Sequence, residues 1–253
     1  MNKFKQLLKE EFVNGMKTFD WCFLAFGLLL QVVAIILAAT ISSLHDDYLA
    51  ITAISGITGV ISVVLCSRGK ISQYFFGYIQ LFTYLFGVAI PCGLGGETAE
   101  NIVYAVTMII GIFIWIKRYR RKDEETTVET KNMTSFSWAI TSAATVISIL
   151  LFAMLLKFVP SVNIWLTGSE NPAPFLDSVT TIVPLAGQML MVFGYSDQWI
   201  FWFIEDVMSL VMFIVLGNGI MIAQYIFWTA NCVYGYLNWR KLSVKTVDKC
   251  EVV

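Results

Sequence analysis

The chain has 253 residues, of which 57% are hydrophobic and only 14% are charged. An average soluble domain is about one quarter charged, so this composition excludes an ordinary soluble domain and favours a membrane protein. His45 is the single histidine, and the five cysteines show no CxxC spacing. We therefore expect no metal site and no other cofactor, and we interpret the cysteines as small apolar packing residues. The net charge of −1 gives no indication of nucleic-acid binding.

Eight apolar runs, separated by charged or turn residues, are close to the length of about 20 residues that crosses a bilayer core. The first run is longer than the apolar core of a signal peptide, roughly 7 to 15 residues, so we expect it to be retained as a helix. The sequence therefore predicts an all-α polytopic membrane protein with eight transmembrane helices. In chain order the runs cover Trp21 to Ile41, Tyr48 to Cys66, Gln73 to Leu94, Ile102 to Ile116, Trp138 to Val159, Phe175 to Phe193, Trp199 to Leu216 and Ile220 to Trp239.

Basic residues are distributed very unevenly between the two sides that eight spans define. Sixteen of the seventeen Lys and Arg residues fall on the side that carries both termini, and Lys157 is the exception. The opposite loops contain acidic and turn residues, among them His45-Asp46-Asp47 and the stretch Gly96 to Glu100. Because cytoplasmic loops carry the excess of Lys and Arg, we expect residues 1–20, the connector 117–137 and the tail 240–253 in the cytoplasm.

Two short motifs recur at nearly the same spacing, which indicates an internal duplication. The stretch from Gly111 to Arg118 resembles Gly235 to Lys241 at an offset of 124, and Gln73 to Phe76 resembles Gln198 to Phe201 at an offset of 125. Residues 48–116 and 175–239 would then be two three-helix copies that point the same way, because four spans separate equivalent helices. The span 138–159 links the copies, and the helix 21–41 stands outside them. Parallel repeats of this kind place a transporter's substrate site between the halves.

The seventh span carries two acidic residues, Glu205 and Asp206, although an ionisable side chain in the bilayer core costs about 2.5 to 3.5 kcal/mol. Trp199, Trp202 and Asp206 share one helical face. Indole rings stack on flat heteroaromatic rings and attract cations. We expect Trp202 and Asp206 to face a cavity, whereas Trp199 is equally compatible with the interfacial aromatic belt.

Other spans carry polar faces as well. In the eighth span Gln224, Trp228, Asn231, Gly235 and Asn238 share a stripe with Tyr234 beside it, and such amides must face protein or water rather than lipid. For Asn238, hydrogen bonding between helices is the favoured interpretation. The first copy contributes two further faces, Gln73, Gly77, Gln80 and Tyr84 in the third span and Tyr104, Met108, Gly111 and Trp115 in the fourth. We interpret Gly77 and Gly111 as helix-packing positions.

Several of these segments resemble the PnuC family of bacterial vitamin transporters, best known for nicotinamide riboside uptake. The resemblance covers roughly residues 50 to 245. It rests on Arg68-Gly69-Lys70, the stretch Tyr74 to Gln80, Pro174 to Asp177 with Thr180-Thr181, Gln198 to Trp202, and Asn231 to Trp239.

The resemblance implies a fold and an activity. It implies a three-plus-one-plus-three helix arrangement like that of the SWEET sugar transporters, in the bacterial cytoplasmic membrane. It also implies facilitated diffusion of a small vitamin that carries no phosphate, trapped afterwards by cytoplasmic phosphorylation. The sequence leaves undecided whether the protein forms a homo-oligomer.

The chain departs from the family pattern at named positions. Asp206 stands where the family has Asn four residues after the Trp, Gln80 stands where Asn is expected, and Val106 and Met108 replace a Pro and a Gln. An ionised Asp206 would suit the pyridinium charge of nicotinamide riboside or the thiazolium charge of thiamine. The expected substrate-binding residues are Trp202, Asp206, Gln80, Tyr104, Asn231, Tyr234, Trp199, Trp228, Gln198 and Gln224.

Other functions remain as alternatives. Within the same class, the substrate could be thiamine or another nucleoside-like vitamin. A proton-coupled transporter would use Glu205 and Asp206 as a relay. A membrane scaffold would bind no small molecule. An intramembrane enzyme is disfavoured because His45, the only histidine, sits in an outer loop without a nucleophile in reach.

Overall fold

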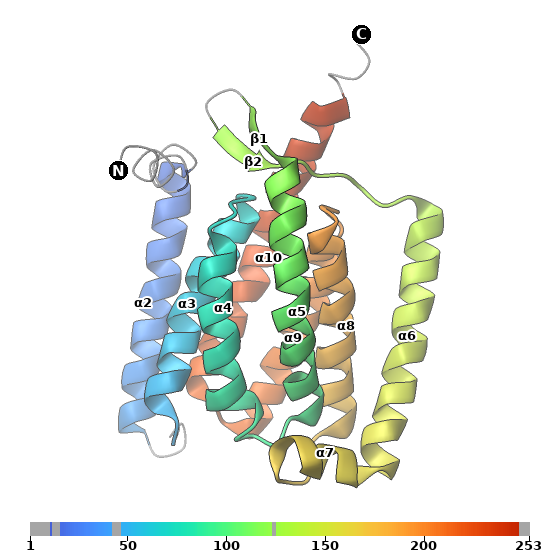
Figure 1. Cartoon of the computed structure of the whole chain (residues 1–253). Coiled ribbons are helices and arrows are strands. Elements are labelled where there is room, and N and C mark those ends of the chain that lie inside the picture. Colours follow the sequence, from blue (N-terminus) through green and yellow to red (C-terminus); the bar gives the residue numbers. More distant parts are fainter. Residues whose placement is uncertain (1–10, 12–15, 42–46, 123–124, 248–253) are drawn as a thin grey trace.

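The computed structural model describes residue 11 and residues 16–41, 47–122 and 125–247. Within these ranges the chain is a bundle of helices that run nearly parallel to one another, with one short β-hairpin at one end (Figure 1). The helical class expected from the apolar periodicity is therefore confirmed, and the hairpin is an addition to it. His45, Cys250 and the basic residues Lys3, Lys5, Lys9 and Lys249 lie outside the described residues.

The first half of the chain forms four long helical segments. α2 covers Thr18–Thr40 and α3 covers Leu49–Ser67. α4 covers Gln73–Tyr84 and continues as the π-helical turn η3, Leu85–Ala89. The α5 helix covers Gly95–Arg118 and leads into the antiparallel hairpin of β1, Tyr119–Lys122, and β2, Glu125–Val128.

The second half repeats the alternation of long helices. It consists of α6, Ser135–Phe158, the short α7, Pro160–Thr167, α8, Pro174–Val192, α9, Gln198–Leu216, and α10, Gly219–Val247. Local chemistry sets several ends: the Thr134 hydroxyl caps α6, and proline, whose fixed φ suits a first helical turn, begins α7 and α8. Gly168 and Gly217 end α7 and α9 with positive φ.

Six helices in the described ranges are long and apolar enough to cross a membrane: α2, α3, α5, α6, α8 and α9. The protein is thus a multi-pass membrane protein. The structure differs from the sequence expectation in three features. α5 begins at Gly95 rather than near Ile102, so that Glu97 and Glu100 lie inside the helix and not in a loop. The charged connector contains a hairpin, and the expected loop after α6 contains α7.

The helices surround a common interior. α3 packs on α4 and α10, α5 packs on α8, and α8 packs on α9. α2 packs against α3 and α10 from outside, and α6 stands at the edge of the bundle against α8 (Figure 1). Phe136 and Phe158 of α6 are largely exposed, as expected for a helix that faces lipid.

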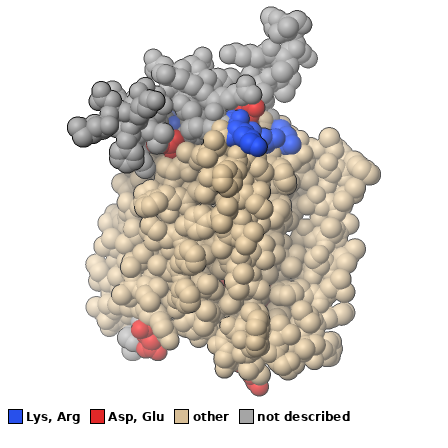
Figure 2. Space-filling view, viewed as in Figure 1, with Lys and Arg blue, Asp and Glu red and all other residues tan. Residues whose placement is uncertain are grey.

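On the face shown in Figure 2, surface charge lies at the two ends of the molecule. In Figure 2 an uncharged belt separates one end, where Lys and Arg side chains lie beside acidic ones, from the other end, where only acidic side chains are coloured. α2 begins and α10 ends at the end with the Lys and Arg side chains, which we call the basic end (Figure 1). We call the opposite end, where α7 lies, the α7 end.

Candidate functional site

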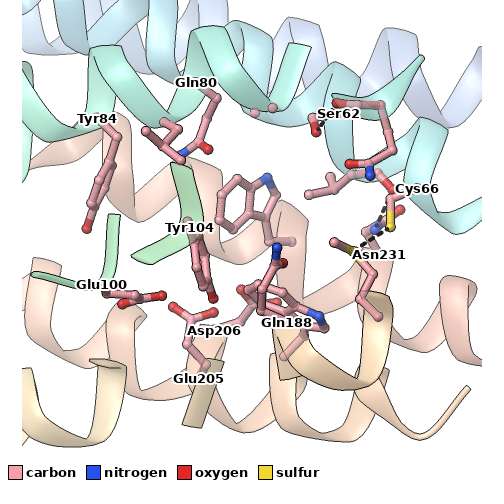
Figure 3. A pocket seen from close by; sticks show the side chains of 18 of the residues that line it. Ser62, Cys66, Gln80, Tyr84, Glu100, Tyr104, Gln188, Glu205, Asp206 and Asn231 are labelled. Atoms are coloured by element: carbon pink, nitrogen blue, oxygen red, sulfur yellow. Dashed lines mark hydrogen bonds between the residues drawn. The ribbon is translucent and has the colours of Figure 1, made fainter. Parts of the chain in front are cut away.

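A cavity lies between the helices of the two halves (Figure 3). Its wall is built by α3, α4 and α5 from the first half and by α8, α9 and α10 from the second half. The cavity volume is about 130 Å³, and the empty space rises to about 960 Å³ when the open part around it is included. The structure therefore provides a cavity between the two halves, where the sequence expects one.

Seven of the ten expected substrate-binding residues line this cavity. They come from four helices and both halves, and Trp202 and Asp206 face inward rather than toward lipid. The seven are Gln80, Tyr104, Trp199, Trp202, Asp206, Trp228 and Asn231.

The other three expected residues lie outside the lining. Tyr234 points toward α2, where its hydroxyl donates to the Asp20 carboxylate. Gln198 is buried behind Trp202 and accepts a hydrogen bond from its indole N–H at 3.4 Å. Gln224 is buried with its amide against Gly59 of α3. Gln198 is therefore placed to orient a cavity residue rather than to contact a ligand.

Aromatic rings form much of the wall. Trp202 and Tyr104 meet edge to face, with ring centroids 6.1 Å apart, and Trp228 meets Tyr225 in the same way at 5.2 Å. Edge-to-face pairs fix the orientation of both rings. Neither indole is fully buried and both line the cavity, so both rings are within reach of a flat ligand.

Four carboxyl groups line the cavity, and sequence reasoning found only two of them. Glu205 and Asp206 come from α9, whereas Glu97 and Glu100 come from the first turns of α5. In Figure 3, Glu100, Glu205 and Asp206 lie together near Tyr104 and Tyr84. No Lys or Arg occurs among the described residues of the lining, so the chamber favours a cationic or hydrogen-donating occupant.

Asp177 of α8 explains why α5 begins where it does. Its carboxylate accepts hydrogen bonds from the backbone N–H groups of Gly96 at 2.8 Å and Glu97 at 3.0 Å, and from the Asn171 amide at 2.6 Å. An acidic side chain at a helix N-terminus satisfies free N–H groups and complements the helix dipole. This contact from the second half fixes the first turns of α5, and with them Glu97 and Glu100.

Internal donors orient three of the carboxyl groups. The Cys232 thiol donates to Asp206 Oδ2 at 3.0 Å, and the Ser209 hydroxyl donates to Glu205 Oε1 at 2.7 Å. The Tyr84 hydroxyl donates to Glu97 Oε2. The other oxygens of the two glutamates, Glu205 Oε2 and Glu97 Oε1, are buried and accept no well-formed hydrogen bond, although Tyr225 and Asp206 lie close to Glu205 and Thr180 lies close to Glu97.

Toward the basic end, the lining offers donors as well as an acceptor. The side-chain N–H groups of Gln73 and Trp199 and the carbonyl oxygen of the Asn231 amide are buried there without a protein partner. The Asn231 amide N–H donates to the Val63 carbonyl at 3.2 Å, which aims its oxygen. Buried polar groups are normally satisfied, so unsatisfied ones that line a cavity mark places where a ligand can bind.

Two tryptophans join the halves at the basic end of the cavity. The indole N–H of Trp115 donates to the Met191 carbonyl at 3.2 Å, and that of Trp239 donates to the Cys66 carbonyl at 3.0 Å. The two donors differ by 239 − 115 = 124 positions and the two acceptors by 191 − 66 = 125, which are the offsets of the duplicated motifs. Cys66 and Met191 also touch through their sulfur atoms at 3.6 Å.

Comparison with known proteins gives consistent matches. The family model described as nicotinamide mononucleotide transporter matches residues 49–241. A curated protein of Haemophilus influenzae, named nicotinamide riboside transporter PnuC, is 34% identical over 94% of this chain and 97% of its own length. A Neisseria mucosa protein of the same name is 29% identical over 92% of this chain and 85% of its own. A structure described as the crystal structure of the vitamin B3 transporter PnuC superposes with a TM-score of 0.77 at 27% identity, covering 95% of this chain and 98% of that one.

Proposed function

Since this chain belongs to the nicotinamide mononucleotide transporter family, the family of the PnuC proteins, we propose that it carries nicotinamide riboside across the bacterial cytoplasmic membrane by facilitated diffusion. Proteins of this family are membrane transporters and not enzymes. Cytoplasmic phosphorylation of the transported riboside would keep its concentration lower inside the cell and so maintain an inward gradient.

One observation carries the proposal: aromatic rings and four carboxyl groups line the cavity, without a Lys or Arg among its described residues. Nicotinamide riboside combines a flat cationic pyridinium ring with hydrogen-bonding groups. A tryptophan face attracts such a ring by about 0.5 to 2 kcal/mol. The same cavity disfavours a phosphate group, because like charges in a chamber of low dielectric repel strongly.

The cavity suggests a role for each of the seven expected residues that line it. Trp202 stacks on the ring from α9, with Trp228, Trp199 and Tyr104 closing the aromatic wall. Asp206, held by Cys232, partners the positive charge. Gln80 and Asn231 bond the carboxamide and the ribose, because amide groups both donate and accept hydrogen bonds.

Replacing Asp206 by Asn tests the charge-partner role. The substitution keeps the shape and removes the charge, so the affinity for nicotinamide riboside should fall about tenfold, the size of one charged hydrogen bond. Tryptophan fluorescence quenching of purified protein measures it. The control is Glu170→Gln, which removes an exposed acidic charge outside the cavity. If Asp206→Asn binds and selects its ligands like the parent protein, Asp206 does not partner the charge.

We also propose the finer architecture: eight membrane-spanning segments, with α3 to α5 and α8 to α10 as two parallel repeats, α6 as the linker, and both termini in the cytoplasm. The exchanged hydrogen bonds of Trp115 and Trp239 support the repeat, because equivalent residues contact equivalent partners across the halves. The interrupted helix α4–η3 and the polar helix α10 would supply the two further spans. The concentration of Lys and Arg at the basic end supports the orientation.

Proton coupling is the second candidate, because Glu205 and Asp206 are buried neighbours that line the cavity. In proteoliposomes, uptake that stops when the proton gradient is dissipated while binding persists would favour it. Facilitated diffusion predicts equal uptake with and without the gradient. Thiamine and unmodified nucleosides in the same assay decide between nicotinamide riboside and the related substrates.

A further inference from the structure

Resting on the proposed function, we infer that Glu97 and Glu205 bind the hydroxyl groups of the substrate's sugar, so that the sugar points toward the α7 end of the cavity. The two glutamates come from α5 and α9, one from each half of the chain. Neither belongs to the residues that sequence reasoning assigned to binding.

The geometry of the two carboxyl groups is that of prepared acceptors. In each, one oxygen is fixed by a neighbouring hydroxyl, from Tyr84 for Glu97 and from Ser209 for Glu205. The second oxygen of each is buried and accepts no well-formed hydrogen bond from the protein, and both residues line the cavity. Both side chains are nearly inaccessible, at 3% and 4% exposure, so an unfilled acceptor there is costly unless a ligand supplies the donor.

The polar groups elsewhere in the cavity set the direction of the ligand. Gln73, Trp199 and Asn231 offer unpartnered donors and an acceptor toward the basic end, which suits a carboxamide that both donates and accepts. Trp202 lies between these groups and the glutamates along α9. In Figure 3 Asn231 and Cys66 lie at one end of the cavity, whereas Tyr84 and Glu100 lie at the other. A ring at Trp202 therefore places the carboxamide at Asn231 and the sugar at the glutamates.

Hydroxyl donors fit the glutamates better than a metal ion does. Among the described residues, no group of three or more His, Cys, Asp or Glu side chains could hold a metal. A carboxylate accepts hydrogen bonds but cannot donate them, so its ligand must bring O–H or N–H groups. The sugar hydroxyls are the donors of nicotinamide riboside that remain once its carboxamide is placed at Asn231.

The test compares two ligands on the full-length protein: nicotinamide riboside and its 2′,3′-dideoxy analogue, which keeps the charged ring and loses two hydroxyls. The parent protein should bind the analogue about tenfold more weakly, as expected for the loss of hydrogen bonds to charged acceptors. Glu97→Gln and Glu205→Gln should each weaken the riboside about tenfold and narrow the difference between the ligands. Because removal of a charge affects both cationic ligands alike, the change in their ratio reports the hydroxyl contact. Glu170→Gln serves as the matched control and should leave both affinities unchanged.

Each outcome separates this inference from the proposed function. If the parent protein binds neither ligand, the proposed function fails. If it binds both equally, or if the glutamine variants weaken both by the same factor, the sugar contact is overturned while the transporter proposal stands. The comparison of ligands on the parent protein decides the question even if a glutamine variant does not fold.

Discussion

At the scale of single residues, Trp115 and Trp239 connect the halves, because each indole N–H donates a hydrogen bond to a backbone carbonyl of the opposite half. Trp239→Phe keeps an aromatic ring and removes one N–H donor. The variant should unfold with a free energy lower by about 1 to 2 kcal/mol, the cost of losing a buried hydrogen bond. Thermal unfolding in detergent measures the change, and Trp115→Phe should behave alike. A neutral effect of both would show that the paired indoles contribute only packing.

Asp20 is the second residue whose contacts reach both halves. Its carboxylate pairs with Arg68 at the end of α3, at 3.2 Å, and accepts a hydrogen bond from Tyr234 of α10. Asp20→Ala removes a fully buried charged partner, so stability should fall by about 3 kcal/mol or more. Asp20→Asn, which keeps the acceptor oxygen, should cost less. Equal stability of the alanine variant and the parent protein in thermal unfolding would show that the contacts of Asp20 do not help α2 to hold α3 and α10 together.

At the scale of helices, close packing depends on glycine at equivalent positions of α5 and α10. A Cβ atom at Gly235 would lie 2.5 Å from the Trp199 ring, and one at Gly111 would lie 2.6 Å from the Tyr74 hydroxyl. Gly235→Ala should destabilise the protein by about 1 to 3 kcal/mol through overpacking. Gly111→Ala should cost less, because it meets the end of a side chain rather than the middle of a fused ring. Gly168→Ala cannot serve as the control, because Gly168 has a positive φ that alanine rarely adopts. Ala143→Gly, at an exposed position of α6, is the control for the effect of an alanine–glycine exchange on backbone freedom alone.

At the scale of the whole molecule, the proposed orientation predicts the fate of reporters fused to the carboxyl terminus. Green fluorescent protein should fluoresce there, and alkaline phosphatase should be inactive, because the first works in the cytoplasm and the second outside it. The same reporters fused after Ser169, two residues beyond the end of α7, should give the reverse result. An active phosphatase at the carboxyl terminus would overturn the assigned orientation in the membrane.

The apolar periodicity predicts the helices well because lipid imposes one requirement on every span. The inward direction of Trp202 and Asp206 also follows from helical spacing and the cost of burying charge. Glu97 and Glu100 were missed because Gly95-Gly96 is typical of a loop, whereas Asp177, far away in sequence, caps those residues into a helix. Tyr234 was assigned to the cavity from its place beside a polar stripe, but α2 covers it with Asp20, a partner that no repeat pattern reveals.

The segment from Val128, the last residue of β2, to Lys131 connects the two halves at the basic end. Val128 N–H bonds the Gly69 carbonyl, and Lys131 N–H bonds the Gly194 carbonyl. The two acceptors are equivalent corners of the halves, 194 − 69 = 125 positions apart, and both glycines have positive φ. Because the short segment from Val128 to Lys131 is bonded to both corners, it resists their separation. If the substrate leaves the cavity at the basic end, one of these two hydrogen bonds must break, or the two halves must tilt together with the segment still attached to both.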